Sequence, residues 1–480
     1  MSSSITGQAV KGTVWSAIDR FGTMGLQFVV NLVLARLLTP ANFGAIGMLM
    51  IFITVSQVFA DGGFGSALIQ KKNPTQTDYS TIFFWNTGIG CVLYLILFLC
   101  APAISAFYHM PVLESVLRVI GLTIITSCIS SIQTNRLQKA LQFKAIAITD
   151  TGAFVIGGVV GISMAFAGYG VWSLAAMMLV QGVAKILILH AVSRWVPALT
   201  FSVSSFRQLF TFGGYLFLSN LLESICRNLQ GIVIGRKFSA AQMGYYSQAS
   251  KLDNITSYSI PQVIAAVMYP IFSMVQDDRE RLRNIVEMDI RIISLTIYPL
   301  LSLLIIVSEP LIELLYGAQW IPSAPYFSIL CFGGFFMCLN NIPYYAVAAC
   351  GRSRELLFAS LYKWGMLAIL MLIGMNFGMN GIMWSISVSF ANVFMTNVFL
   401  ARRYASISFR GIVRSLAPTI GMVLASAIVV GLISYFIHVN WLLKSVLFIS
   451  VYIACTMIIR PRAYADSKAM LQRLFRKNDD

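Results

Sequence analysis

Long apolar stretches alternate with short polar segments along almost the whole chain. Each stretch has about 20 residues, which is enough for a helix to cross a hydrocarbon core of about 30 Å. The pattern predicts an all-α polytopic membrane protein with fourteen transmembrane helices. The predicted spans are residues 12–37, 43–68, 80–107, 112–133, 145–167, 171–191, 210–235, 242–273, 289–309, 324–350, 356–376, 381–401, 414–437 and 441–460.

Composition agrees with this pattern. The chain is 58% hydrophobic and 11% charged, which leaves too few polar side chains to cover a water-soluble body of 480 residues. The eight cysteines lie in apolar runs without the spacing of metal ligands. The sequence contains no Walker motif, zinc motif or nucleophile elbow, so it predicts neither an enzyme nor a resident metal or cofactor.

Basic residues between the spans predict the topology. If the N-terminus is cytoplasmic, nearly all lysines and arginines outside the spans fall on the cytoplasmic side, and both termini are cytoplasmic. The net charge of +16 then reflects attraction to an anionic leaflet, so no nucleic-acid partner is expected. The exceptions on the outer side are Arg36, Arg236, Lys237 and Lys444.

Three of these exceptions belong to a repeated motif. ARLLTPANFGAI (35–46) aligns with GRKFSAAQMGYY (235–246), with identities at Arg36/Arg236, Ala41/Ala241 and Gly44/Gly244. A weaker likeness relates APAISAFYHMP (101–111) to EPLIELLYGAQWIP (309–322). The repeats predict two six-helix lobes, 1–200 and 201–405, related by a pseudo-twofold along the membrane normal, then a helix pair (406–461) and a basic cytoplasmic tail (462–480). Duplicated halves with a cleft between them are typical of alternating-access transporters.

Charged residues inside the spans indicate the substrate, because a charge at membrane depth is costly and usually faces a cavity or a partner. Lys251 and Lys363 have no carboxylate three or four residues away. Together with Arg20 and Arg227 they predict a cationic site for an anionic substrate, most simply a phosphate or diphosphate. Two alternatives stay open: Arg227 can pair with Glu223 on the same helical face, and Arg20 with Asp61.

Several stretches then resemble a known family: FADGGFGSALIQKK (59–72), TIFFWN (81–86), FKAIAITD (143–150), GYYSQASKL (244–252) and LYGAQWIPSAP (315–325). They look like the Wzx-type lipid-linked oligosaccharide flippases of the polysaccharide transporter family, in the MOP exporter superfamily. The likeness covers roughly residues 5–400 and is greatest for the branch that serves colanic-acid and teichuronic-acid type polymers.

This resemblance implies a multi-pass protein of the bacterial inner membrane. Such a protein moves undecaprenyl-diphosphate-linked oligosaccharide from the cytoplasmic to the periplasmic leaflet for export of a surface polysaccharide. The implied partners are the lipid-linked oligosaccharide, membrane lipids, and a polysaccharide polymerase with its export machinery. Aromatic residues such as Trp85, Tyr258 and Trp364 can stack on sugars, although packing against neighbouring helices is the simpler and favoured role.

Two further sets of residues have expected roles. Arg36 and Arg236 would form a periplasmic gate across the pseudo-twofold, unless they only reach the headgroup region. Asp61, with Asp19 nearby in the first span, is a candidate site for coupling to a proton or sodium gradient. The glycines that follow Asp61, at positions 62, 63 and 65, predict a bend or an unwound turn. The rival interpretation is a permanent ion pair between Asp61 and Arg20.

Three other functions compete with the flippase. A MATE-like multidrug or cation antiporter has the same fold, and a lipid II flippase has related substrate chemistry. A polymerase or ligase of the same pathway usually has a large periplasmic loop, whereas every predicted outer loop here is short. Residues 414–460 fall outside the duplication and would form a groove for the isoprenoid tail or merely a wall facing lipid.

Overall fold

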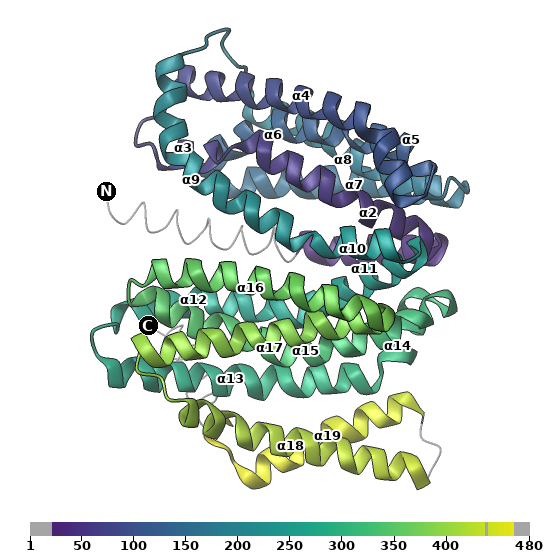
Figure 1. The fold of residues 1–480 in the computed structure, drawn as a ribbon, viewed down its shortest axis with the longest axis vertical. Helices are drawn as coiled ribbons and strands as arrows, with labels where there is room; N and C mark the ends of the chain where they lie inside the picture. The colour runs from purple at the N-terminus through teal and green to yellow at the C-terminus, as the bar shows by residue number, and fades with distance from the viewer. Residues whose placement is uncertain (1–21, 437–439, 465–480) are drawn as a thin grey trace. The chain divides into compact units, whose positions relative to one another are not determined.

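The computed structural model describes residues 22–436 and 440–464 and is helical throughout these ranges, apart from turns and short connections (Figure 1). The chain packs into two units, residues 1–244 and 245–480. The predicted all-α architecture is confirmed. The predicted lobes follow the duplication rather than the packing, so their boundary near residue 200 stays a prediction.

The first unit contains the helices up to the start of α11. They are Gly22–Leu37, α2 (Pro40–Asp61), α3 (Phe64–Gln70), α4 (Gln76–Tyr108), α5 (Val112–Ile120), α6 (Leu122–Lys139), α7 (Phe143–Phe166), α8 (Val171–Ser193), α9 (Val203–Arg227), α10 (Leu229–Lys237) and α11 (Ala240–Asn254).

The second unit contains the remainder of α11 and the helices after it. They are η1 (Ile255–Ser259), α12 (Ile260–Met274), α13 (Arg279–Ile306), α14 (Ser308–Tyr316), η2 (Ala318–Ser323), α15 (Ala324–Ala349), α16 (Ser353–Gly374), η3 (Met375–Phe377), α17 (Gly378–Tyr404), α18 (Phe409–Phe436) and α19 (Trp441–Ile459).

Within the described residues, 11 helical segments are long and apolar enough to cross a membrane. One of them, Ser353–Tyr404, has 52 residues and contains both α16 and α17, which pack against each other as the predicted spans 356–376 and 381–401. The predicted spans that begin at residues 12 and 210 correspond to Gly22–Leu37 and to α9 with α10, which are not among the 11. The multi-pass architecture is established, and the count of fourteen stays a prediction.

The connection from α8 to α9 is held against the start of α4 by hydrogen bonds. The indole Nε1 of Trp195 donates to Gln76 Oε1 (2.7 Å), and the backbone N–H of Ser202 donates to Thr81 Oγ1 (3.0 Å). Asp78, at the same end of α4, is buried and forms a salt bridge with Lys71 (2.8 Å). These contacts attach the beginning of α9 to the first unit.

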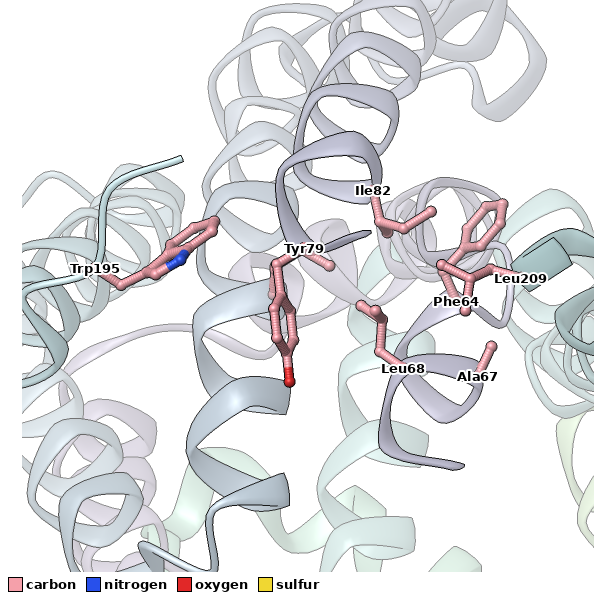
Figure 2. Close-up of a cluster of buried hydrophobic side chains, with 8 residues drawn as sticks. Phe64, Ala67, Leu68, Tyr79, Ile82, Trp195 and Leu209 are labelled. Atoms are coloured by element: carbon pink, nitrogen blue, oxygen red, sulfur yellow. The ribbon is translucent and has the colours of Figure 1, made fainter. Parts of the chain in front are cut away.

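An apolar cluster lies beside these hydrogen bonds. Figure 2 shows Trp195 and Tyr79 on one side of the cluster and Phe64 with Leu209 on the other. Trp85 packs against the cluster, with its ring 4.4 Å from that of Phe206. Packing is therefore the observed role of Trp85, which was one of the candidate sugar-stacking residues.

The second unit is built around α15. This helix packs against α12, α13 and α17, and small residues allow the close approach. A side chain at Gly333 would meet Ser387 of α17 within 2.8 Å, and one at Gly334 would overlap the hydroxyl of Ser257 in η1.

Helices α18 and α19 lie side by side at one edge of the second unit, against α13 (Figure 1). The Tyr452 hydroxyl of α19 donates to the carbonyl of Leu295 on α13 (2.9 Å). The opposite faces of both helices expose large apolar side chains, as a surface facing lipid requires: Leu424, Ile428, Leu432, Leu442, Leu443, Val446, Ile449 and Ile453.

Candidate functional site

The repeated motif forms the same local structure at both places. Helix Gly22–Leu37 stops before Leu38–Thr39 and α2 begins at Pro40; α10 stops before Phe238–Ser239 and α11 begins at Ala240. The residues before each break have matching exposure, with position 34 or 234 buried and position 36 or 236 exposed. The predicted hairpin between the first and second helix of each repeat is therefore present twice.

The two hairpins contact each other reciprocally inside the first unit. A Cβ placed on Gly44 would overlap the carbonyl oxygen of Ala240, and a Cβ placed on Gly244 would overlap the carbonyl oxygen of Pro40. Position 40 is the repeat equivalent of 240, and 44 of 244. The contact is therefore isologous, as expected at a local twofold axis. We call this contact, formed by residues 40, 44, 240 and 244, the crossing. Only glycine at both positions permits helix backbones to approach this closely.

Arg236 is held at this crossing by the end of α4. Its Nη1 lies 2.8 Å from His109 Nε2, and its guanidinium lies over the ring of Phe107, 5.2 Å from the centroid. His109 ends α4 in the left-handed conformation (φ 54°). The stretch 101–111, which the sequence singled out as a second repeat, thus contacts the arginine of the first.

The second span of the first unit is broken after Asp61, as the glycines predicted. Gly62 and Gly63 adopt φ values of 55° and 74°, and α3 begins at Phe64. The Asp61 carboxylate accepts hydrogen bonds from the backbone N–H groups of Gly63 and Gly65. The break also packs backbone to backbone on α9, because a Cβ at Gly213 would lie 3.1 Å from the carbonyl oxygen of Gly63. Arg20 and Asp19, the predicted partners of Asp61, lie outside the described residues.

The corresponding span of the second unit is interrupted differently. A π-helical turn, η1, separates α11 from α12, and Pro261 follows in the first turn of α12. The proline ring excludes the carbonyl four residues earlier and removes one N–H donor, which accounts for the widened turn. Such turns are frequent at functional sites in helices.

Around this turn, polar and aromatic residues form a stripe along α11 and α12. Lys251, Asn254, Tyr258 and Gln262 recur at spacings of three and four residues, so they share one helical face. Lys251 and Asn254 are exposed, and Tyr258 and Gln262 are half-buried. We call this set the polar stripe.

Helix α15 extends the polar stripe. The Asn341 amide donates to Gln262 Oε1 (3.4 Å), and the rings of Tyr345 and Tyr269 are 5.2 Å apart. The sequence predicted Lys251 and Tyr258 as site residues, and it did not indicate Asn254, Gln262 or Asn341. The signal that could have found Asn254 and Gln262 is their spacing of three and four residues from Lys251 and Tyr258, whereas Asn341 required the fold.

The other predicted cations have identifiable contacts. The Lys363 ammonium lies over the ring of Trp364, 4.1 Å from the centroid, so Trp364 is partly covered by the lysine beside it. Arg227 Nε is 2.9 Å from Glu223 Oε1, which is the alternative that their spacing allowed. Arg227 belongs to the first unit, and Lys251 and Lys363 belong to the second. Their convergence on one cleft stays a prediction.

Two further intramembrane cations of the first unit form ion pairs. Lys185 of α8 bonds Asp150 of α7 (2.7 Å), and Arg118 bonds Glu114 (2.9 Å) while lying over the ring of Phe98. These pairs satisfy the charges locally, as structural residues do in a membrane.

Comparisons with known proteins give these features a context. A family model described as polysaccharide biosynthesis protein matches residues 33–325. The succinoglycan biosynthesis transport protein ExoT of Rhizobium meliloti (strain 1021) is 26% identical over 72% of this chain and 70% of its own length. The teichuronic acid biosynthesis protein TuaB of Bacillus subtilis (strain 168) is 26% identical over 73% of each chain. The lipopolysaccharide biosynthesis protein WzxC of Escherichia coli (strain K12) is 25% identical over 70% of this chain and 69% of its own.

Solved structures show the same fold at low sequence identity. The lipid II flippase MurJ in an inward closed conformation matches with a TM-score of 0.75 and 15% identity, covering 93% of this chain and 98% of MurJ. A multidrug MATE transporter of the MOP superfamily matches with a TM-score of 0.63 and 16% identity, covering 81% and 98%. The family match spans more than half of the residues, and the chain belongs to the family of polysaccharide biosynthesis proteins.

Proposed function

We propose that this protein translocates a lipid-linked oligosaccharide across the bacterial plasma membrane for export of a surface polysaccharide, and that it does so by alternating access. Family membership supports the pathway, and the names of ExoT, TuaB and WzxC all refer to biosynthesis or transport of such polymers. The observation that carries the proposal is the polar stripe with its exposed Lys251, in a helical segment that is long and apolar enough to cross a membrane.

The chemistry of the substrate requires such a stripe. A diphosphate and a sugar chain lose their hydration in hydrocarbon, and each unpaired polar group costs several kcal/mol there. Lys251 can replace water around the diphosphate. Lys363, Arg227 and Arg20 are the other cations that the sequence predicts for binding the diphosphate. The amides at 254, 262 and 341 suit sugar hydroxyls, because they both donate and accept hydrogen bonds.

The reciprocal hairpin contact supplies a gate. In the proposed topology both termini are cytoplasmic, which places the Gly44–Gly244 crossing and both motif arginines at the periplasmic side. Separation of the crossing would open a path to the periplasm. Arg36 and Arg236 would then meet the emerging diphosphate.

Coupling to a proton or sodium gradient is part of the proposal, with Asp61 as its candidate residue in the first unit. The hydrogen bonds from Gly63 and Gly65 hold the carboxylate at a break in the helix, where the glycine backbone can change conformation. The undecaprenyl tail would remain in lipid along the apolar faces of α18 and α19. A polysaccharide polymerase and its export machinery would receive the product.

The decisive experiment is deletion of the gene followed by identification of the glycolipid that accumulates on the cytoplasmic leaflet. An undecaprenyl-diphosphate oligosaccharide that accumulates in the deletion strain and disappears on complementation supports the function. Normal surface polysaccharide with no accumulating glycolipid would overturn it.

Two alternatives share the fold and are distinguished by substrate. Rescue of a strain depleted of its lipid II flippase would indicate peptidoglycan precursor transport. Stimulated efflux of an organic cation from vesicles would indicate a MATE-like antiporter, although the exposed cation of the polar stripe disfavours a cationic substrate.

A further inference from the structure

A buried carboxyl group in the second unit has no role in the function proposed above. Asp253 is 5% exposed and lies in the last turn of α11. It is two residues from Lys251, so the two side chains point to different sides of the helix. Lys251 is on the exposed side, and Asp253 faces η1 and α15.

Polar groups from two elements contact Asp253. The Ser257 hydroxyl, within the π-helical turn, donates to Asp253 Oδ1, and the Cys331 thiol of α15 donates a further hydrogen bond. Gly334 of α15 makes this arrangement possible, because any side chain there would displace the Ser257 hydroxyl. The site is therefore built from three elements that meet at the interruption of the span.

The titratable groups around Asp253 are all neutral when protonated. They are Tyr246 on its own helix and Cys331 and Cys338 on α15. On α13, which also packs against η1, Tyr298 donates to the Phe335 carbonyl of α15. The side chains that donate hydrogen bonds to Asp253 within the described residues are the Ser257 hydroxyl and the Cys331 thiol, and both are uncharged. A buried carboxyl without a cation holds a proton or takes up a cation, because an isolated buried charge is too costly.

The π-helical turn offers a way to change this environment. A π-helical turn contains one extra residue relative to an α-helix, and its removal rotates the preceding helix by about 100° relative to the following one. Such a change would break the Ser257 contact and turn Asp253, together with the rest of α11, relative to α15 and α12. Away from α15, the carboxyl group would meet water.

We propose that Asp253 is a proton-carrying residue of the second unit, which holds a proton in the described packing and releases it to water when the π-helical turn rearranges. The proposal rests on the transport function above, for which it provides a coupling step. The step is a proton transfer: the carboxyl O–H bond breaks as the proton passes to a water molecule, and it forms again when a proton returns from the aqueous phase.

Difference infrared spectroscopy of the purified full chain between acidic and alkaline pH tests the proton directly. We expect a carbonyl stretching band of a protonated carboxylic acid that shifts in deuterated water and is lost in Asp253→Asn. Asp289→Asn is the matched control, because Asp289 is a second buried acid (2% exposed) and its removal should leave the Asp253 band in place. A spectrum of Asp253→Asn identical to that of the wild type would overturn the proposal.

A transport assay separates this proposal from the transport function itself. In vesicles, the probe is undecaprenyl diphosphate bearing a fluorescently labelled glucose, and its translocation is followed by chemical quenching with and without an imposed pH gradient. We expect Asp253→Asn to translocate the probe while losing stimulation by the gradient. Full stimulation in this variant would overturn the coupling role, whereas wild-type protein that never moves the probe would instead contradict the proposed function.

Discussion

The reciprocal contact at Gly44 and Gly244 leads to a quantitative prediction about the proposed gate. Replacement of either glycine by alanine places a methyl group against the carbonyl of residue 240 or residue 40. The atoms that block the methyl are backbone atoms, which cannot turn away as a flexible side chain can. The two helices must therefore move apart, and we expect both single variants to weaken the crossed state.

The size of the effect follows from overpacking and helix propensity. Overpacking of a tight interface typically costs 1–3 kcal/mol, which corresponds to a roughly 5- to 150-fold shift in the equilibrium between crossed and separated states. Glycine to alanine inside a helix also stabilises the helix by about 1 kcal/mol. Gly421→Ala in α18 is the control for helix propensity alone, because Gly421 is helical and has open space at its Cβ position.

The effect is measured by disulfide formation between cysteines introduced in place of Ala41 and Ala241, which flank the crossing. The eight native cysteines must first be replaced, since they would form competing crosslinks. We expect the crosslinked fraction to fall in Gly44→Ala and in Gly244→Ala and to be unchanged in Gly421→Ala. Moving the two helices apart once relieves both clashes. The free-energy cost to the crossed state in the double variant, calculated from the crosslinked fraction, should therefore be smaller than the sum of the costs in the two single variants.

Two results would contradict this reasoning. One is an unequal response, with crosslinking sensitive to alanine at 44 and insensitive to alanine at 244, since the contact is the same from either side. The other is strict additivity of the two single effects, which would mean that the positions act through separate interfaces.

Three further predictions follow from the site. Lys251→Ala and Lys363→Ala should each abolish polysaccharide export while the protein still inserts into the membrane, and arginine should restore part of it because charge matters more than shape; unimpaired export in both alanine variants would remove these lysines from the site. Cysteines in place of Arg36 and Arg236 should crosslink when the cavity faces the cytoplasm and should then stop transport; failure with reagents of every length would argue against a gate at these positions. Asp61→Asn should still translocate substrate down its gradient but lose the response to an imposed ion gradient, whereas a purely structural Asp61 would show itself as a lower melting temperature with coupling intact.

The helices were predictable because the apolar periodicity of a membrane span is long and strong. The repeated hairpin was predictable as well, since a motif with identities at Arg36/Arg236, Ala41/Ala241 and Gly44/Gly244 recurs at an offset of 200 positions and has the same helix break. The break after Asp61 followed from Gly62 and Gly63, for which positive φ costs little. In each case the cause lies within a few residues of its effect.

The contacts of the site were less predictable, because they depend on residues far apart in the chain. No local signal could show that Arg236 would meet His109, or that Lys185 would pair with Asp150. Trp85 has the large aromatic ring that stacking on a sugar requires, and yet it packs against Phe206. A side chain in an apolar span is compatible with several partners, and only the packing of the helices selects among them.

The two interrupted spans, α2 with α3 and α11 with α12, suggest how a tightly packed membrane protein can open. Both begin at the reciprocal crossing, and both are interrupted within their length, one by Gly62 and Gly63 and the other by the π-helical turn before Pro261. Opening by a rigid-body motion alone would need no interruption. A neighbouring helix packs closely on each interruption, at Gly213 against the backbone of Gly63 and at Gly334 against the side chain of Ser257. An acidic residue lies beside each interruption, so a change in its ionisation acts where the helix bends most easily, and we infer that helix bending and ion coupling use the same positions.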